Sequence, residues 1–259
     1  MTFNTMCDFC KGSKLSEFDE RLKSITEIVI NTQADIISLQ ELRSVEQLNT
    51  INSSLKDYGQ IVTQNLIFSY ADPSILYNKK KMELMNSGQF WLGPNSGNLS
   101  FGWKLSLPRQ VLWARFKYQQ TEFLFMSTHI DNRLENMDGS TIMIHDFIKD
   151  IKVPIILAGD TNQTSYMPEY KRLTQGTFVN AYKIKNEFNI IGNKKQERDL
   201  CYLKKGKVFP ECLVDHILFS QSHPFEVKNY TIDISRNFKE TFPSDHRAIF
   251  IDIKINKLN

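Results

Sequence analysis

The sequence has no apolar run long enough to cross a bilayer, and it does not open on a basic stretch followed by an apolar segment. It also lacks an excess of one charge. Its 32 basic and 29 acidic residues leave a net charge of +3, which neither requires nor excludes a nucleic-acid partner. Repeats, low-complexity tracts and linkers rich in proline, glycine and serine are absent as well. We therefore expect a monomer with a single domain over residues 1–259 and one large core.

Cysteine is also scarce, with four residues in two local pairs, Cys7 with Cys10 and Cys201 with Cys212. Reduced thiols would fit a cytoplasmic enzyme, whereas a disulfide across residues 201–212 would suit an exported protein. A four-cysteine zinc site needs two closely spaced pairs, and only the first pair has that spacing, so zinc is disfavoured. The sequence leaves a cytoplasmic and an exported location equally open.

Hydrophobic periodicity predicts helices first, then a strand-rich middle, and helix again before the last strands. Ser16 and Asp19 have the spacing of a capping box at the start of the first helix. Residues 183–211 are polar and lysine-rich, which indicates a long loop or ragged hairpin that could select substrates. The pattern favours an α+β fold of two packed mixed β-sheets flanked by helices. The expected helices span residues 16–32, 45–55, 140–151 and 168–173; the expected strands span 35–41, 61–68, 74–77, 82–91, 110–118, 122–126, 153–160, 213–219, 225–234 and 248–255, with a hairpin at 117–122.

Four short polar clusters are each interpreted as lying at the end of a run of β-branched and other apolar residues. Strands that end in Asp, Asn and His indicate acidic and imidazole groups gathered at one edge of a sheet. Such a gathering is how proteins commonly hold a divalent cation and a phosphate. The clusters are residues 127–132 (STHIDN), 159–162 (GDTN), 214–216 (VDH) and 244–246 (SDH).

Together with Thr2-Phe3-Asn4 and Leu39-Gln40-Glu41, these clusters resemble, in order and nearly from end to end, the motifs of the endonuclease/exonuclease/phosphatase superfamily. The resemblance implies a deoxyribonuclease-I-like fold, which is a four-layer α/β-sandwich, and hydrolysis of phosphoesters. Residues 87–115 are similar to those of a group of uncharacterised bacterial members. That group usually has His where this chain has Asn132, so the role of this position stays open.

The resemblance implies a Mg²⁺ (or Mn²⁺) site. Glu41 follows a buried strand and is the first choice as a ligand, although a carboxylate there also fits a solvated charge at a helix start. Asn4 would help to hold the metal or a phosphate oxygen. Asp245 would be a further ligand or an orienting carboxylate. A hard cation bound by oxygen ligands lowers the repulsion between a phosphoester and the attacking water.

The catalytic residues would be His246, Asp215, Asp160 and Asn162. His246 is the candidate general base, and Asp215 would accept its other ring N–H and so fix the tautomer. Asp160 and Asn162, two residues apart, can point the same way if the segment is extended. Asp160 would then serve near the leaving oxygen or a second metal, and Asn162 would donate to phosphate. His216 alternates with Asp215 along a strand and is left out of the set.

His129 is expected to contact the scissile phosphate, although a lone His after an apolar strand is often structural. Relatives frequently support this His with a Glu, and Asp72 is the candidate for that place. Arg109 would bind substrate phosphate, or it forms a surface salt bridge instead. Asp131 is assigned to substrate binding because it lies close to His129 in sequence, without a defined role.

Three functions are consistent with these residues. The leading one is a metal-dependent nuclease or other phosphodiesterase, with nucleic acid as a candidate partner. The alternative is a phosphatase or a sphingomyelinase-like phospholipase that acts on an inositol or lipid headgroup, for which residues 99–103 (LSFGW) are a short candidate membrane-contact loop. The third is an inactive binding module, which is disfavoured because Glu41, His129, Asp160 and His246 are all present.

Overall fold

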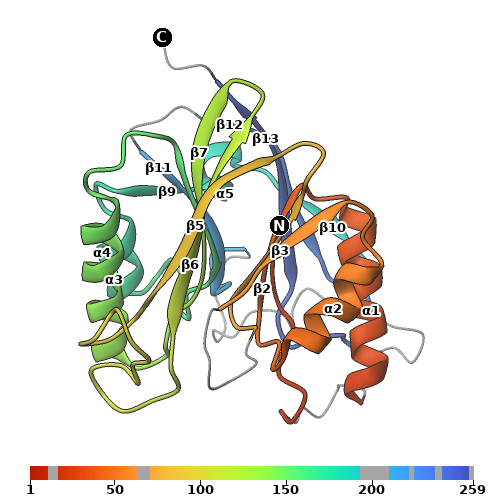
Figure 1. Cartoon of the computed structure of the whole chain (residues 1–259), viewed down its shortest axis with the longest axis horizontal. Coiled ribbons are helices and arrows are strands. Elements are labelled where there is room, and N and C mark those ends of the chain that lie inside the picture. The colour runs from red at the N-terminus through yellow and green to blue at the C-terminus, as the bar shows by residue number, and fades with distance from the viewer. Residues whose placement is uncertain (11–16, 64–70, 193–209, 222–224, 237–240, 257–259) are drawn as a thin grey trace.

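The structure is a computed structural model, and it describes every residue except 11–16, 64–70, 193–209, 222–224, 237–240 and 257–259. Its strands form two mixed sheets that pack face to face, and helices cover both outer faces (Figure 1). The predicted α+β sandwich of two packed sheets is therefore confirmed. None of the helices in the described part of the chain is long and apolar enough to cross a membrane.

One sheet has seven strands in the order β10-β12-β13-β1-β2-β4-β3. Its pairs β1–β2 and β10–β12 are parallel and the others are antiparallel. The short strand β1 therefore lies in the middle of the sheet, between β13 and β2. The strands are β1 (Thr2–Asn4), β2 (Ile36–Gln40), β3 (Tyr58–Ile61), β4 (Ser74–Asn78), β10 (Asn189–Ile191), β12 (Phe225–Asp233) and β13 (Ala248–Ile255).

The second sheet has six strands in the order β5-β6-β7-β8-β11-β9. Only β7 and β8 run parallel, and their register places His129 beside Asp160 at their carboxyl ends. The antiparallel pairing of β11 with β8 places Asp215 opposite Asp160. The strands are β5 (Glu83–Trp91), β6 (Gln110–Tyr118), β7 (Thr121–His129), β8 (Ile155–Asp160), β9 (Phe178–Asn180) and β11 (Asp215–Ser220).

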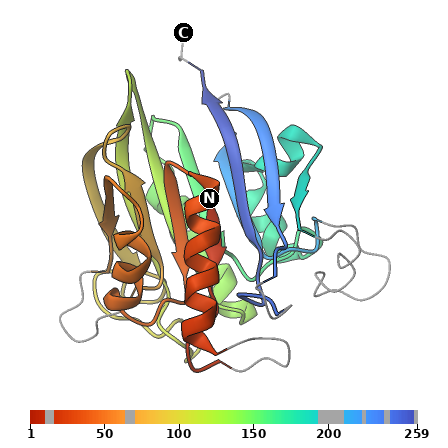
Figure 2. The same cartoon turned by 90° about the vertical axis from the view of Figure 1, so that its right-hand side faces the viewer.

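The helices cover the two outer faces because each has one apolar side. Helices α1 (Phe18–Thr32) and α2 (Val45–Ser53) pack against the seven-stranded sheet (Figure 2), for example through Ile25 and Leu48. Helices α3 (Leu134–Ile148) and α4 (Pro168–Thr174) pack against the six-stranded sheet. The short helix α5 (Ala181–Lys185) contacts β9, β11 and β12. The main core lies between the two sheets and is built from their inward-facing side chains.

Most of the predicted elements are confirmed to within a few residues, and β6 matches its predicted span of 110–118. Two predictions were wrong in detail. In place of the strand expected at 61–68, β3 spans Tyr58–Ile61. Its pairing with β4 runs from Tyr58 opposite Asn78 to Ile61 opposite Ile75. Residues 64–70 lie outside the described part of the chain. Helix α3 begins at Leu134 rather than at 140. The N-cap residue of α1 is Glu17, and the predicted capping box rests on Ser16, which lies outside the described residues.

The segment 183–211 is not wholly irregular. It contains the end of α5 and strand β10, which adds to the edge of the seven-stranded sheet beside β12. Residues 193–209, where the substrate-selecting loop was expected, lie outside the described residues.

Gly159 permits the close pairing of β7 and β8 that brings His129 next to Asp160. Its φ is +152°, and a Cβ at this position would lie 2.0 Å from the backbone oxygen of Thr128. Any other residue would force the two strands apart just before the polar cluster. Glycine in the GDTN cluster is thus required by the packing of the backbone.

Candidate functional site

The polar clusters gather at one end of the sandwich, the lower end in Figure 1. Asn4 ends β1, Glu41 directly follows β2, His129 ends β7 and Asp160 ends β8. His246 lies in the segment that precedes β13. The parallel pairs β1–β2 and β7–β8 each place two carboxyl ends side by side, and the packing of the two sheets brings the pairs together. The sequence predicted that these groups gather, but at one edge of a single sheet.

Asn4 joins the two sheets at this end. Its Nδ2 donates to Oε1 of Glu41 at 3.0 Å and to Oδ2 of Asp160 at 2.9 Å, while its Oδ1 accepts the N–H of Met6. The amide therefore presents its donor side to the two carboxylates. In this orientation Asn4 positions the acidic groups, and its Oδ1 accepts one N–H and keeps a second lone pair, so its role in holding the metal or a phosphate oxygen stays a prediction.

Glu41 is held from two sides. Besides Asn4, the N–H of Cys7 donates to its Oε2 at 2.9 Å, and Cys7 is tied to Cys10 by a disulfide. The φ of Glu41 is +63°, which is uncommon for a residue with a side chain and is typical of positions that function constrains. Its side chain is 24% exposed, so the carboxylate is reachable from solvent. Cys212 is also disulfide-bonded, and Cys201 lies outside the described residues.

His129 is buried and oriented by Asp72, the carboxylate that was predicted to support it where relatives frequently have Glu. Its Nδ1 lies 2.9 Å from Oδ2 of Asp72, which also accepts Nη1 of Arg109 at 3.0 Å. Arg109 Nη1 lies 2.6 Å from the same ring nitrogen. Burial disfavours the Asp72 carboxylate, but the neighbouring His129 and Arg109 outweigh burial and hold the pKa of Asp72 at about 2. With Nδ1 facing Asp72, Nε2 of His129 faces Glu41 and Asp160 at 3.8 and 3.4 Å.

Of the two alternatives for Arg109, the surface salt bridge was wrong. Its side chain is only 13% exposed, and its ion pair with Asp72 is buried. Arg109 reaches the site because β6 begins at Gln110, next to the end of β7. The guanidinium therefore positions His129 and Asp72 rather than lying free on the surface.

His246 forms the second histidine–aspartate pair. Its Nδ1 lies 2.7 Å from Oδ2 of Asp215, and its Nε2 faces Oδ2 of Asp160 at 3.8 Å. Burial opposes the charged imidazolium, but Asp215 and Asp160 outweigh burial and raise the pKa of His246. Burial raises the pKa of Asp215, since its carboxylate leaves water. His216, which points away from this pair and contacts Asn180 and the oxygen of Gln163, stays outside the site as predicted.

The backbone after Asp160 is not extended. Asn162 has φ +54°, its N–H donates to Oδ1 of Asp160 at 2.7 Å, and its Nδ2 donates to the oxygen of Ile130 at 2.8 Å. The extended segment on which a shared direction of the two side chains depended is therefore not formed. Burial opposes ionisation of Asp160, but His246 and His129 outweigh burial and hold the pKa of Asp160 below its usual range.

The donor set fits a hard divalent cation. Glu41, His129 and Asp160 bring one donor atom each within 4.8 Å of one another, and Asp160, Asp215 and His246 do the same. Oδ1 of Asp215 is buried without a hydrogen-bond partner in the described part of the chain. Carboxylate oxygens are the ligands that Mg²⁺ and Mn²⁺ prefer, and the excess of buried acidic groups favours a bound cation. Glu41 and Asp160 are the residues best placed to hold one.

Two further predicted residues, and the position whose role was left open, lie beside these groups. Asp131 is 3% exposed and accepts the N–H of Arg133, so it stabilises the turn before α3. Asp245 is exposed beside His246 and belongs to none of the three candidate metal groups that the described residues form. Asn132 is exposed on the turn after β7.

Sequence reasoning missed Arg21, which is 2% exposed in α1. Its guanidinium donates to the backbone oxygens of Thr5, Met6 and Cys7 at 2.8, 3.1 and 2.8 Å, and to that of Pro243 at 3.2 Å. The first three carbonyls belong to the segment whose Cys7 N–H binds Glu41, and the carbonyl of Pro243 belongs to the segment that carries His246. Arg21 thus joins these two segments from inside the protein. The only signal in the sequence is a cation on the apolar side of a helix, opposite to the usual pattern.

We expect Arg21→Met to lower the free energy of unfolding by at least about 3 kcal/mol, since it leaves buried carbonyl groups without donors. Urea unfolding followed by circular dichroism measures this. Arg43→Met is the control. Arg43 is 65% exposed and pairs with Asp8 at 3.5 Å, so its loss should cost less than about 1 kcal/mol. Equal stability of the two variants would show that the Arg21 contacts do not hold these segments.

The sequence profile of the Endonuclease/Exonuclease/phosphatase family matches residues 1–246. No curated protein sequence is significantly similar to the chain. Among solved structures, the chain is similar to Bacteroides thetaiotaomicron VPI-5482 mannosyl-6-phosphatase Bt3783, with 23% identity over 98% of each chain and a TM-score of 0.77. An endonuclease/exonuclease/phosphatase from Bacteroides vulgatus has 23% identity, over 98% of this chain and 97% of that one, and a TM-score of 0.80. D. rerio TDP2 complexed with single strand DNA product has 16% identity over 92% of each chain and a TM-score of 0.67. At these identities the likeness shows a shared fold.

Proposed function

Because the chain belongs to the endonuclease/exonuclease/phosphatase family, we propose that it is a divalent-metal-dependent hydrolase of phosphoester bonds, with phosphodiesters, including nucleic acid, as its leading substrates. The observation that carries this proposal is the pair of oriented imidazoles. His129 and His246 both direct Nε2 toward Oδ2 of Asp160, at 3.4 and 3.8 Å. Each ring is fixed through Nδ1 by its own carboxylate.

Glu41 and Asp160 would hold the cation, Mg²⁺ or Mn²⁺, with His129 Nε2 nearby. A bound divalent cation would supply Lewis-acid stabilisation of the negative charge that develops on the phosphoryl oxygens. Asn4 keeps both carboxylates in place through its amide nitrogen. The N–H of Cys7 fixes the other oxygen of Glu41, so the carboxylate is oriented before any ligand arrives.

The two imidazoles would divide the proton transfers. His246 would accept a proton from the attacking water at Nε2, because Asp215 holds Nδ1 and stabilises the imidazolium that results. His129, held by Asp72 and Arg109, would stabilise or protonate the leaving oxygen. This division suits displacement at phosphorus, in which the attacking and leaving oxygens need separate groups.

A phosphomonoester or a headgroup phosphate is the second candidate substrate. The similar Bacteroides thetaiotaomicron protein is named a mannosyl-6-phosphatase. A lipid headgroup has its own supporting observation. Four large apolar side chains precede Arg109 in the segment between β5 and β6, and they are 41–79% exposed; they are Phe101, Trp103, Leu105 and Leu107.

A substrate panel tests the proposal. The purified chain with Mg²⁺ is incubated with supercoiled plasmid, single-stranded RNA, mannose 6-phosphate, an inositol polyphosphate and sphingomyelin, and the His246→Ala variant is assayed in parallel. Nicking of plasmid or cleavage of RNA by the wild type alone supports the diesterase. Release of phosphate from mannose 6-phosphate or the inositol polyphosphate, or of phosphocholine from sphingomyelin, without any cleavage of nucleic acid assigns the second candidate. Failure on every substrate contradicts both.

A further inference from the structure

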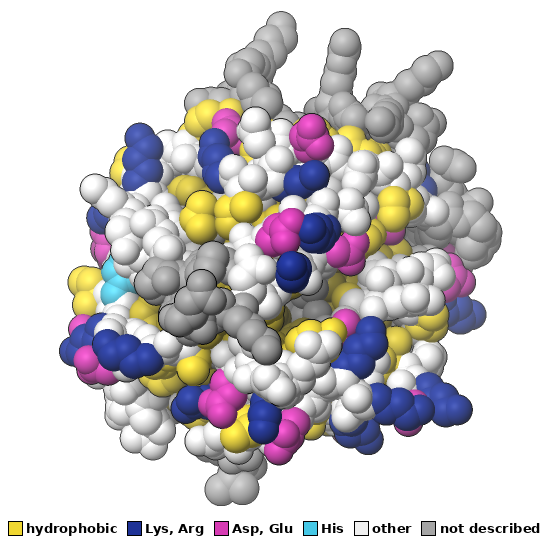
Figure 3. All heavy atoms as spheres, turned by 90° about the horizontal axis from the view of Figure 1, so that it is seen from above, with side chains coloured by type: hydrophobic (Ala, Val, Ile, Leu, Met, Phe, Trp, Pro, Cys, Tyr) yellow, Lys and Arg dark blue, Asp and Glu magenta, His cyan; other side chains and the backbone are white. Residues whose placement is uncertain are grey.

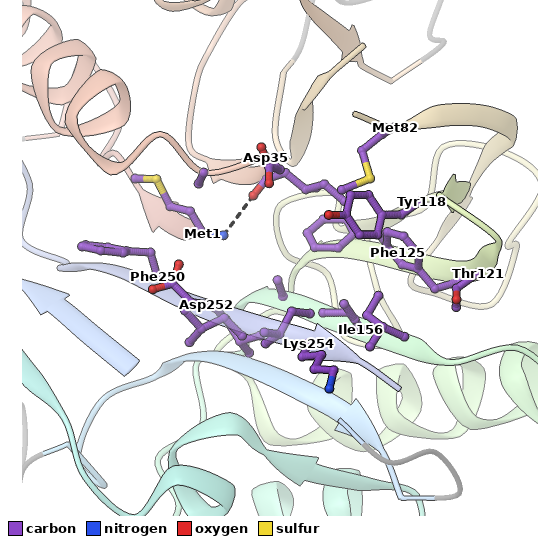
Figure 4. A pocket seen from close by; sticks show the side chains of 18 of the residues that line it. Met1, Asp35, Met82, Tyr118, Thr121, Phe125, Ile156, Phe250, Asp252 and Lys254 are labelled. Carbon is purple, nitrogen blue, oxygen red and sulfur yellow. Dashed lines mark hydrogen bonds between the residues drawn. The ribbon is translucent and has the colours of Figure 1, made fainter. Parts of the chain in front are cut away.

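A pair of cysteines lies directly beside the candidate site. Cys7 comes three residues after β1 and Glu41 directly follows β2, and these strands are parallel neighbours, so both residues lie at the same end of the sheet. The strands start from the opposite end, where apolar and charged side chains mix on the surface (Figure 3) and where Met1 and Asp35 lie (Figure 4). One donor atom each of Cys7, Cys10 and Glu41 lies within 4.8 Å of the others. The proposed hydrolytic reaction uses neither sulfur.

Hydrogen bonds hold this turn in addition to the disulfide. The guanidinium of Arg21 donates to the backbone oxygen of Cys7 at 2.8 Å. The same oxygen accepts the N–H of Cys10 at 3.3 Å, which closes the turn through the backbone. The N–H of Cys7 donates to Oε2 of Glu41 at 2.9 Å. We therefore expect the two cysteines to stay next to Glu41 when the bond between their sulfur atoms is broken.

A small reductant has access to the disulfide through Cys10. This residue is half-buried, whereas Cys7 is 7% exposed. A dithiol would transfer two electrons and two protons to the disulfide: the bond between the sulfur atoms breaks, two cysteine thiols form, and the dithiol closes into a cyclic disulfide. Reduction thus leaves two free thiols within reach of one carboxylate.

We propose that the reduced pair of Cys7 and Cys10 binds one Zn²⁺ together with Glu41. Thiolates favour Zn²⁺ over Mg²⁺, and two cysteines separated by two residues have the spacing usual for zinc ligands. On binding, both thiols release their protons, and a water molecule takes the fourth position. This site has three protein ligands, so it differs from the four-cysteine site that the sequence disfavours.

The geometry of the turn suits this coordination. A tetrahedral zinc with bonds of about 2.3 Å to sulfur holds its two sulfur atoms about 3.8 Å apart. The Cα atoms of Cys7 and Cys10 are 5.2 Å apart, so rotation of the freed side chains can reach that separation. Two thiolates and a carboxylate exceed the charge of the ion by one. The buried cation of Arg21, bonded to the oxygen of Cys7, lies close enough to offset this excess.

The consequence for catalysis rests on the proposed function. Glu41 is one of the two residues best placed to hold the catalytic cation, and a Zn²⁺ bound to the thiols would draw its carboxylate away. The oxidised chain has no thiolate at this position, so its Glu41 stays available for Mg²⁺. Zn²⁺ would therefore inhibit the reduced chain more strongly than the oxidised one.

Titration of the full chain with Co²⁺ tests the site, because a cobalt–thiolate bond absorbs in the near ultraviolet and cobalt bound only by carboxylate and imidazole does not. The chain is reduced with dithiothreitol and freed of the reagent without oxygen. We expect a thiolate band that saturates at one Co²⁺ per reduced chain, is absent from the oxidised chain and disappears when Zn²⁺ displaces Co²⁺. The reduced chain should bind Zn²⁺ at least about tenfold more tightly than the oxidised chain.

Three variants assign the ligands. Cys10→Ser should lose the thiolate band. Cys212→Ser is the matched control and should keep it, because Cys212 belongs to none of the candidate metal groups of the described residues. Glu41→Gln should weaken Zn²⁺ binding to the reduced chain at least about tenfold, since the amide lacks the charge of the carboxylate.

Several results would overturn the site: loss of the circular dichroism of the folded chain on reduction, no thiolate band in the reduced wild type, an undiminished band in Cys10→Ser, or a band lost from Cys212→Ser. Unchanged Zn²⁺ affinity in Glu41→Gln overturns the carboxylate ligand.

Hydrolysis of bis-p-nitrophenyl phosphate at fixed Mg²⁺ tests the consequence. Zn²⁺ should inhibit the reduced chain at a concentration at least about tenfold lower than it inhibits the oxidised chain. Equal inhibition of the two forms overturns the competition for Glu41. A chain that hydrolyses nothing in either form counts against the proposed function, and the cobalt spectra still decide the zinc site.

Discussion

His246→Ala is expected to lower the turnover number at least about a hundredfold, because removal of a general base typically costs a factor of about 10²–10⁴. The imidazole is the group that would take the proton from water, and Asp215 at 2.7 Å keeps its Nε2 directed toward the site. The measurement is the rate of bis-p-nitrophenyl phosphate hydrolysis at saturating Mg²⁺. Circular dichroism checks that the variant is folded.

His145→Ala is the matched control for this variant. His145 lies on α3, and its Nε2 contacts the backbone oxygen of Leu173 at 2.9 Å, away from the polar clusters. Its loss should leave the turnover number close to that of the wild type. A folded His246→Ala variant with a near-normal rate would remove His246 from the proposed mechanism.

Glu41→Gln should weaken Mg²⁺ or Mn²⁺ binding at least about tenfold, since even residues behind the ligands of a metal contribute about 10–100-fold to affinity. The amide keeps the shape of the side chain and one acceptor oxygen, so the contacts with Asn4 or Cys7 are partly retained. What it loses is the negative charge that a hard cation requires. Calorimetric titration with Mn²⁺ gives the affinity, and the Mg²⁺ dependence of the rate gives the functional effect.

Glu135→Gln serves as the control for the loss of one carboxylate. Glu135 is 58% exposed on α3 and pairs with Lys104 at 3.0 Å. The metal affinity and the rate of the Glu135→Gln variant should match those of the wild type. Equal Mn²⁺ affinity of Glu41→Gln and the wild type would show that the cation, if bound, is held elsewhere.

The sequence predicted part of the arrangement of the site because that part follows from strand ends. The strands that stop at Asn4 and Gln40 are parallel neighbours in one sheet, and those that stop at His129 and Asp160 are parallel neighbours in the other, so each pair places its end residues side by side. The packing that joins the two pairs was not predicted. The pairing of His246 with Asp215 followed from the same motifs. Asp72 also lies where the family resemblance placed the carboxylate that supports the first His.

The parts that sequence reasoning missed depend on contacts between residues far apart in the chain. Arg21 donates to Pro243, and Asn4 to Asp160; these pairs are separated by 222 and 156 residues. No local pattern reports such bonds. The sequence left open whether the backbone at Asn162 is extended, because a left-handed φ at a non-glycine residue depends on its hydrogen bonds to Asp160 and Ile130.

The central claim is that this cluster hydrolyses phosphoesters with a divalent cation. It is tested most directly by stripping the wild-type chain of metal with a chelator and following bis-p-nitrophenyl phosphate hydrolysis before and after addition of Mg²⁺. The proposed function predicts negligible hydrolysis by the stripped chain, recovery with Mg²⁺ in the wild type, and no comparable recovery in His246→Ala. Undiminished hydrolysis by the stripped wild type, or equal recovery in both proteins, would contradict it.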